Sequence, residues 1–203
     1  MASKTAPPSF ASRYAAVDIP WAIDAPQPAL VELAEQEKIV GDVLDLGCGV
    51  GDNSLMMARR GHYVWGLDQE PEALRRAREK QDQQKIEDVT FIEGRMTDVL
   101  HFGEGFHTVL DSGMFHFLDD SEHADYLECL RHVMFPNSRL FLLVLADKPS
   151  PHLEGATGIK RSEIRHLFTA QNGFRVKHIE PVDYVLKTEG VKAWLATIIR
   201  LAD

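Results

Sequence analysis

The feature that most constrains this chain is a glycine-rich loop between a short apolar strand and a helix. Residues 43–46 are three apolar residues and an aspartate, and glycines stand at positions 47, 49 and 51 directly after them. Glycine is needed where the backbone turns with a positive φ angle, or where a ligand approaches too closely for a Cβ atom. A strand, a glycine loop and a helix in this order predict a βαβ unit with a ligand at the loop.

Strand-like and helix-like segments alternate along the rest of the chain. The predicted strands cover residues 43–46, 63–68, 89–92, 107–111, 139–146, 174–180 and 193–201. The predicted helices begin near Pro28, at Asp52 or Asn53 as the cap, at Pro71, after Ser121 as the cap, and at Lys160. This order predicts an α/β fold, a Rossmann-like, doubly wound and mostly parallel seven-stranded sheet with helices on both faces and an N-terminal lid. Ligands of such sheets bind at the carboxyl ends of the strands.

We expect residues 1–203 to form a single domain, since 203 residues is an ordinary length for one. Residues 1–18 have no acidic residue before Asp18 and no apolar core, so we expect a flexible arm and not a secretion signal. Residues 19–40 contain three prolines within nine positions, which forbids a long helix at their start. This segment is predicted to be a cap or lid.

Composition excludes several classes of partner. The chain has 22 basic and 31 acidic residues, a net charge of −9, which argues against binding to nucleic acid phosphates. Its apolar runs are too short to span a bilayer. Two cysteines make neither a disulfide scaffold nor a cysteine-rich zinc site. We therefore expect a cytoplasmic monomer or homodimer with no nucleic acid or membrane partner.

The loop itself disfavours a phosphate ligand. The third glycine of a dinucleotide fingerprint would stand at position 52, which is Asp52, and a carboxylate repels a pyrophosphate. Asp45 precedes the loop, and Asp68 ends the second predicted strand, where a carboxylate can accept both hydroxyls of a ribose. These acids favour a nucleoside with a cationic tail, such as S-adenosylmethionine.

The same residues carry a family resemblance. Residues 43–51 closely resemble motif I of class I S-adenosylmethionine-dependent methyltransferases, and Asp68 resembles their ribose-binding acid. Residues 111–118 resemble their motif IV in small-molecule enzymes. The segment 20–28 looks like the cap of bacterial enzymes that methylate small heterocycles and thiols, relatives of thiopurine methyltransferases. The resemblance runs from about residue 19 to residue 200 and implies S-adenosylmethionine as cofactor and a small acceptor methylated on N, O or S.

The resemblance also implies a set of cofactor-binding residues. They are Trp21, Asp45, Gly47, Gly49, Gly51, Asp68, Gln69, Arg95, Met96 and Asp111. One position departs from the family, because Arg95 stands where these enzymes carry the Asp that reads the adenine amino group. The Met96 backbone N–H can still meet the adenine and Arg95 can stack on it, whereas Asp98 could substitute only if the loop were shifted.

Two residues are candidates for a part in catalysis. Methyl transfer from a sulfonium is an in-line displacement, in which the protein chiefly supplies position. Asp111 is expected to hold the methionine amino group or line the reaction centre, or alternatively to cap the turn that follows it. His116 can take a proton near neutral pH, which a phenol needs and a thiolate does not, or else it is an inert packed side chain. Trp21 either closes over the site, where its face suits a sulfonium, or anchors the arm.

Other readings of the chain remain open. Asp147 together with Asp111 suggests a magnesium-dependent catechol-type enzyme, but Lys148 follows where those enzymes carry Asn, so we expect no metal. A macromolecule (RNA or protein) methyltransferase is a second reading, disfavoured by the charge and by motif IV. A non-catalytic protein that senses S-adenosylmethionine is a third. A flat, apolar acceptor is predicted by the residues expected to wall its pocket, which are Trp21, Met114, Phe115, Phe117 and His152.

Overall fold

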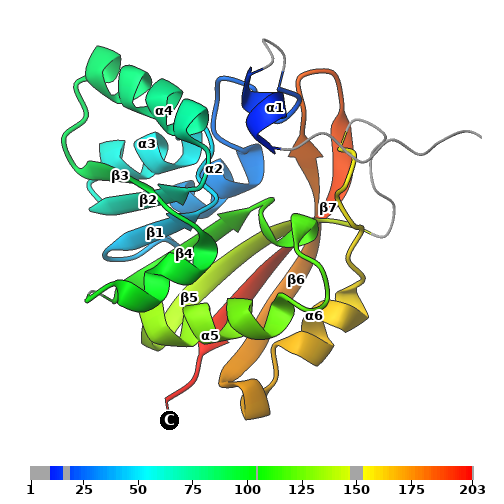
Figure 1. The fold of residues 1–203 in the computed structure, drawn as a ribbon. Coiled ribbons are helices and arrows are strands. Elements are labelled where there is room, and N and C mark those ends of the chain that lie inside the picture. Colours follow the sequence, from blue (N-terminus) through cyan, green and yellow to red (C-terminus); the bar gives the residue numbers. More distant parts are fainter. Residues whose placement is uncertain (1–9, 16–18, 104, 147–152, 203) are drawn as a thin grey trace, which may run out of the picture.

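The computed structural model describes residues 10–15, 19–103, 105–146 and 153–202. In the described residues seven strands form one sheet in the order β3-β2-β1-β4-β5-β7-β6 (Figure 1). They are β1 (Val43–Leu46), β2 (Val64–Asp68), β3 (Val89–Glu93), β4 (Phe106–Ser112), β5 (Met134–Leu145), β6 (Phe174–Val185) and β7 (Gly190–Arg200). β7 is antiparallel to both of its neighbours, and the pairs from β3 to β5 are parallel. The predicted doubly wound, mostly parallel sheet is confirmed.

Helices cover both faces of the sheet (Figure 1). The α-helices are α1 (Phe10–Ala15), α2 (Pro28–Glu35), α3 (Asp52–Arg59), α4 (Pro71–Gln84), α5 (His123–Val133) and α6 (Arg161–Leu167). Short 3-10 helices are η1 (Met96–His101), η2 (Phe115–Phe117) and η3 (Ala170–Asn172). No helix among the described residues is both long enough and apolar enough to cross a bilayer.

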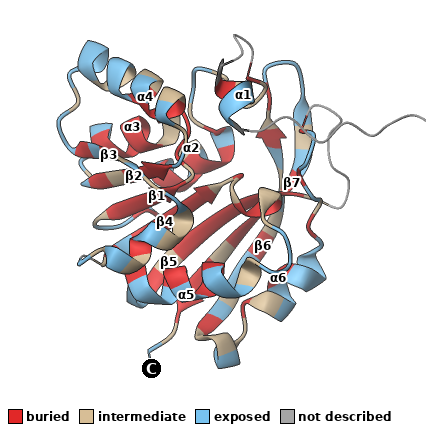
Figure 2. Ribbon diagram, in the orientation of Figure 1, coloured by how far each residue is buried: buried red, intermediate tan, exposed pale blue. Residues whose placement is uncertain are grey.

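The central strand β5 shows how the two faces are built. Leu140 and Leu142 point into the core beneath α5 and α6, while Phe141 and Leu143 point into the core beneath α2, α3 and α4. Alternate side chains of a strand face opposite sides of a sheet, so a strand buried on both faces is apolar throughout. The central strands are accordingly buried, whereas the edge strand β6 is partly exposed and the helices are buried mainly on their inner sides (Figure 2).

The chain reverses its direction of winding between β1 and β4. From β1 it proceeds outward to β2 and β3, and then returns to pair β4 against the other side of β1. The carboxyl ends of β1 and β4 therefore diverge into a crevice, which is where open α/β sheets bind ligands. The glycine loop lies at this switch point.

Several predicted element boundaries differ from those of the structure; β5, for example, begins at Met134 and not at Arg139. α3 has Gly51 as its N-cap, with φ of 79°, and Asn53 instead accepts a hydrogen bond at Oδ1 from the backbone N–H of Gln27. α5 has Glu122 as its N-cap and not Ser121. β6 continues past Pro181, because an edge strand can accommodate a residue without an N–H.

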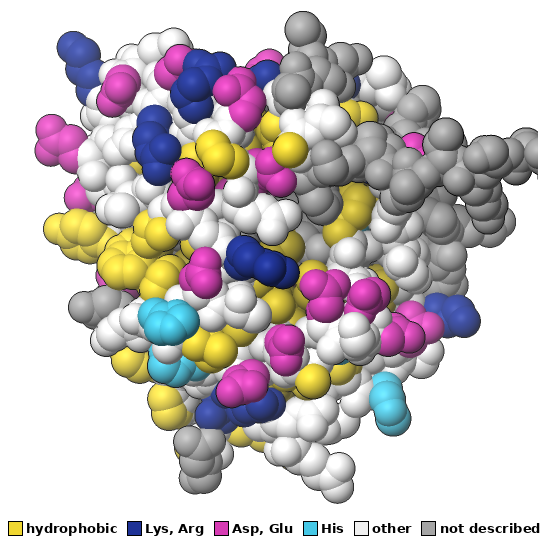
Figure 3. All heavy atoms as spheres, viewed as in Figure 1, with side chains coloured by type: hydrophobic (Ala, Val, Ile, Leu, Met, Phe, Trp, Pro, Cys, Tyr) yellow, Lys and Arg dark blue, Asp and Glu magenta, His cyan; other side chains and the backbone are white. Residues whose placement is uncertain are grey.

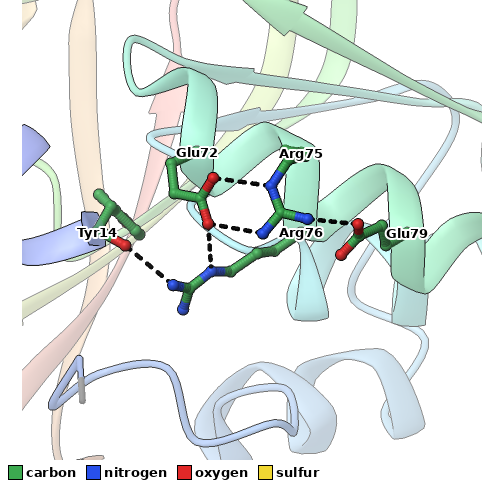
Figure 4. Close-up of polar contacts among 5 residues, drawn as sticks. All are labelled: Tyr14, Glu72, Arg75, Arg76 and Glu79. Carbon is green, nitrogen blue, oxygen red and sulfur yellow. Dashed lines mark hydrogen bonds and ion pairs between the residues drawn. The ribbon is translucent and has the colours of Figure 1, made fainter. Parts of the chain in front are cut away.

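The described part of the N-terminal arm is a short helix that contacts α4. Residues 10–15 form α1, and the ring of Tyr14 is only 4% exposed. The guanidinium of Arg76 on α4 donates to the Tyr14 carbonyl at 2.9 Å and to Glu72 at 3.0 Å (Figure 4). The flexibility expected of the arm stays a prediction, and residues 1–9 and 16–18 lie outside the described residues.

Candidate active site

A cavity of about 280 Å³ opens where the carboxyl ends of the strands meet. The glycine loop, the loops after β2 and β3, the start of α5, the predicted lid and β6 all contribute to its wall. On the face drawn in Figure 3, acidic side chains flank a basic one near the middle. The charged side chains among the described lining residues are Asp52, Asp68, Glu70, Glu122, Asp125 and Arg95. This excess of carboxylates suits a ligand that carries positive charge.

The glycine loop has the backbone geometry that its sequence predicts. Gly47, Gly49 and Gly51 have φ angles of 69°, 55° and 79°, all in the left-handed region. A Cβ atom on Gly47 would lie 2.8 Å from the side chain of Met114. A Cβ atom on Gly51 would lie 2.7 Å from the ring of Phe91. Gly47 and Gly49 line the cavity, and Gly51 lets the start of α3 lie close to Phe91 of β3 and Ala77 of α4.

Asp68 projects from the end of β2 into the cavity and is held there by the backbone. Its Oδ2 accepts the N–H of Gly49 at 2.8 Å, and its Oδ1 accepts the N–H of Glu70 at 2.9 Å. Burial raises the pKa of this carboxyl, and the backbone hydrogen bonds oppose that rise. The side chain remains 9% exposed, so its outer lone pairs can meet a ligand.

The other two predicted strand-end acids do not reach the cavity. Neither Asp45 nor Asp111 is among the described residues that line it, and both are completely buried. Asp111 accepts the N–H groups of Met114 and Phe115 at Oδ1 and the hydroxyl of Tyr126 at Oδ2. This geometry corrects the expectation that Asp111 contacts the ligand, and it matches the alternative of a capped turn.

Asp45 is less fully satisfied than Asp111. The hydroxyl of Ser54 donates to Asp45 Oδ2 at 2.6 Å, while Oδ1 has no hydrogen-bond partner among the described residues. Burial raises the pKa of Asp45 to about 7, and Asp111 and Asp68 add to that rise. Burial likewise raises the pKa of Asp111 to about 6. A cation in the cavity would favour the ionised form of both carboxyls.

The N-terminal segment closes over the glycine loop. The Trp21 indole N–H donates to the Tyr14 hydroxyl at 3.1 Å, and both rings line the cavity. A Cβ atom on Gly49 would lie 3.0 Å from that hydroxyl, so Tyr14 sits directly over the loop. Sequence reasoning placed Trp21 at the site but missed Tyr14, which is an aromatic residue in an arm of small and polar residues.

The lid is fastened to the far edge of the sheet by Gln27. Its amide exchanges two hydrogen bonds of 2.9 Å with the backbone of Val185 at the end of β6. The N–H of Lys187 also donates to the carbonyl of Pro20 at 2.9 Å. Gln27 lines the cavity, yet no local sequence pattern identifies it, because its partners are far away along the chain.

The loop after β3 lies along another side of the cavity. Gln69, Arg95 and Met96 all line it, as predicted for contacts to an adenine ring. Asp98 does not appear among the described lining residues, and its Oδ2 accepts the backbone N–H of Arg95 at 2.8 Å. The shifted loop that would let Asp98 replace the missing acid is therefore not found.

The remaining wall is aromatic. Trp21 and Phe117 lie with ring centroids 6.0 Å apart, and Met114, His116 and Tyr184 line the same cavity. Phe115 instead faces the core, stacked on His123, which corrects its predicted place in the wall. Asp147 and His152 lie outside the described residues. No group of three or more potential metal ligands is found in the described part of the chain.

Comparisons with known proteins agree with this arrangement. Residues 43–137 match a family model described as a methyltransferase domain. The 2-heptyl-1-hydroxyquinolin-4(1H)-one methyltransferase of Mycobacteroides abscessus is 32% identical over 150 residues, which span 73% of this chain and 66% of that protein. The chain belongs to the class I S-adenosylmethionine-dependent methyltransferases.

Solved structures support the same family. A protein from a study of the conversion of a disulfide bond into a thioacetal group during echinomycin biosynthesis has a TM-score of 0.82 and 29% identity, over 93% of this chain and 88% of that one. The 1,6-didemethyltoxoflavin-N1-methyltransferase of Burkholderia thailandensis has a TM-score of 0.68 and 20% identity, over 86% and 77% of the two chains. The second likeness concerns the fold alone.

The cofactor of this methyltransferase is S-adenosylmethionine, and the residues at the site fit it. Gly47 and Gly49 leave a backbone cradle where a Cβ atom would collide with Met114 or Tyr14. Asp68 offers a fixed carboxylate at the end of β2. The acidic lining suits a ligand with a positively charged sulfur.

Proposed function

We propose that this methyltransferase transfers a methyl group to an N, O or S atom of a small, flat aromatic or heterocyclic acceptor. One observation carries the proposal, namely that a single cavity joins the glycine loop and Asp68 to the aromatic side chains of Trp21, Phe117 and Tyr184. The quinolone methyltransferase that resembles this chain bears the name of a small heterocyclic acceptor, which supports the same class.

Within this proposal the cofactor end of the cavity works through fixed contacts. Asp68 accepts the ribose hydroxyls, while Gln69, Arg95 and Met96 flank the adenine. Tyr14 and Trp21 close over the glycine loop and keep water out. Asp45 and Asp111 contribute buried negative charge at longer range. S-adenosylmethionine supplies a methyl group on a positively charged sulfur.

The acceptor end orients the incoming ring and removes its water. Aromatic side chains offer a flat, desolvated surface, which favours a flat ligand over a peptide or nucleic acid strand. Alignment of two reactants in such a cavity can lower a barrier by roughly 7–11 kcal/mol. The residues 19–40 act in this proposal as the lid over both ligands.

The proposal is tested by incubating the protein with S-adenosylmethionine and a mixed panel of phenols, thiols and N-heterocycles. Formation of S-adenosylhomocysteine, measured by mass spectrometry, is expected only when a small acceptor is present. Tight cofactor binding without turnover would support a non-catalytic sensor instead. Methylation of added RNA or protein, with none of the panel, would overturn the small acceptor.

A further inference from the structure

His116 is the one histidine among the described lining residues of the cavity, and it is held rigidly. Its side chain is only 1% exposed and packs against the rings of Phe117, at 4.8 Å, and Tyr184, at 5.9 Å. The N–H of Thr157 donates to the His116 carbonyl at 2.7 Å, which fixes the backbone as well. The imidazole therefore has one orientation toward any acceptor.

The hydrogen bonds of the ring determine which nitrogen carries the proton. The backbone N–H of Leu145 donates to His116 Nδ1 at 3.4 Å. A neutral imidazole has one accepting nitrogen and one N–H, so an accepting Nδ1 leaves the proton on Nε2. No hydrogen bond to Nε2 is found among the described residues. The ring thus retains a free donor.

The same contact makes His116 unsuited to take up a proton. A second proton would have to go to Nδ1, where it would face the N–H of Leu145 donor to donor. Burial lowers the pKa of His116 to about 3, with no charged group of either sign contributing to the shift. The hydroxyl of Tyr184, whose ring packs against His116, donates to the Ser112 carbonyl at 3.4 Å.

His116 and Tyr184 approach each other above Gly113. A Cβ atom on Gly113 would lie 3.1 Å from His116 Cε1 and 2.8 Å from the Tyr184 hydroxyl. Because the proton of Tyr184 is engaged by Ser112, the free N–H of this pair belongs to His116. A ligand whose ring edge enters the cavity beside Gly113 therefore meets a hydrogen-bond donor, the Nε2–H of His116.

We propose that His116 is a neutral hydrogen-bond donor that selects aromatic acceptors presenting an oxygen or nitrogen lone pair at the ring edge, such as a carbonyl or a pyridine-type nitrogen. This inference rests on the proposed function. The lone pair bound by Nε2–H stays unmethylated, so the methyl group goes to another atom or to another lone pair of the same oxygen. The S–CH₃ bond breaks with its electron pair left on sulfur, the acceptor–CH₃ bond forms, and any acceptor proton leaves to water.

Two thiols of the same size test the inference. Thiophenol and 3-mercaptopyridine differ by one ring CH replaced by nitrogen, and in mildly alkaline buffer both are thiolates that need no general base. We expect His116→Phe to lower kcat/KM for 3-mercaptopyridine about tenfold more than for thiophenol, since that is the effect of one lost hydrogen bond. His116→Gln, whose amide N–H₂ can reach the Nε2 position, should restore much of this ratio. The exposed His178→Phe is the matched control and should leave the ratio unchanged.

Binding supplies a readout that does not depend on turnover. With the protein saturated with S-adenosylhomocysteine, calorimetry in the same buffer should show about tenfold weaker binding of 3-mercaptopyridine to His116→Phe, and unchanged binding of S-adenosylhomocysteine itself. An unchanged ratio in His116→Phe overturns the inference. So does a phenol rate that follows the titration of one group and loses that dependence in His116→Gln, because this would identify a base.

The outcomes separate the inference from the function on which it rests. If the wild-type protein turns over no panel member, the proposed function fails, while the calorimetric comparison still decides the role of His116. If other panel members turn over but neither thiol binds, the inference is overturned and the proposed function stands.

Discussion

The two ends of the cavity differ in how their residues are brought together. The cofactor end is made by short segments that directly follow β1, β2 and β3, so each polar residue lies at a strand end. The acceptor end joins Trp21 of the lid, Phe117 of η2 and Tyr184 of β6, which are distant along the chain. Changes at the cofactor end should therefore have local and large effects, whereas the acceptor end depends on long-range packing.

The largest expected effect follows from removing the carboxylate at the cofactor end. Asp68→Ala deletes the acceptor for Gly49 N–H and Glu70 N–H and the contact to the ribose. A hydrogen bond to a charged group contributes about 1.5–3 kcal/mol, so the loss of two such bonds to the ribose should lower the affinity for S-adenosylhomocysteine roughly 100-fold or more. Calorimetric titration measures this. The affinity of Asp68→Asn, which keeps one acceptor oxygen, should lie between those of the wild type and Asp68→Ala. Equal affinities for all three proteins would contradict the assignment of Asp68 to the ribose.

The next effect concerns the packing beneath the glycine loop. Gly51→Ala forces a side chain into a left-handed residue and within 2.7 Å of Phe91, so we expect a loss of about 3 kcal/mol in the free energy of unfolding. Gly61→Ala is the matched control, because Gly61 has φ of 89° and no atom within 4 Å of the new Cβ. Denaturant unfolding of both variants separates backbone strain from the clash. Equal losses would show that packing at Gly51 is unimportant.

The buried acid beneath the loop should make stability depend on pH. The pKa of Asp45 is about 7 in the folded protein against 3.8 for the free side chain, so the folded state binds the proton more tightly. Its stabilising contribution is complete below about pH 3.8 and is lost as the pH rises through 7. The side chain of Asp45→Asn does not titrate. The free energy of unfolding of this variant, relative to that of the wild type, should therefore rise by roughly 1 kcal/mol per pH unit between pH 4 and 7. If the free energies of unfolding of the two proteins, measured by denaturant unfolding, changed in parallel with pH across this range, the pKa of Asp45 would not be raised.

The fold and the cofactor end could be predicted from sequence because their signals are local. Residues 43–51 combine a buried strand, positive-φ glycines and a helix start, and Asp68 ends the next strand. These features depend on neighbours within a few positions. The position of Asp111 was predictable too, but not its use, since the choice between ligand contact and turn capping depends on Tyr126 and the backbone of η2.

The acceptor end could be predicted only in its general chemistry, and the N-terminal segment that covers both ends was predicted only in part. Gln27 fastens the lid through Val185, and Tyr14 reaches the glycine loop from a helix held by α4. Neither residue has a local pattern that marks it. His116 was identified as a site residue, but the proton it carries depends on the backbone N–H of Leu145, which only the folded chain supplies.

The smallest expected effect tests how far the arm belongs to the site. Arg76→Ala removes the bond that holds the Tyr14 carbonyl, so amide hydrogen exchange in residues 10–15 should accelerate and S-adenosylhomocysteine should bind about two- to fivefold more weakly. Arg75→Ala is a matched control, since Arg75 also binds Glu72 but forms no hydrogen bond with Tyr14 among the contacts drawn in Figure 4. Both variants lose an ion pair to Glu72, whose exposed position on α4 makes that loss small. A change confined to Arg76→Ala would therefore trace the effect to Tyr14, and identical behaviour of the two variants would remove α1 from the cofactor end of the cavity.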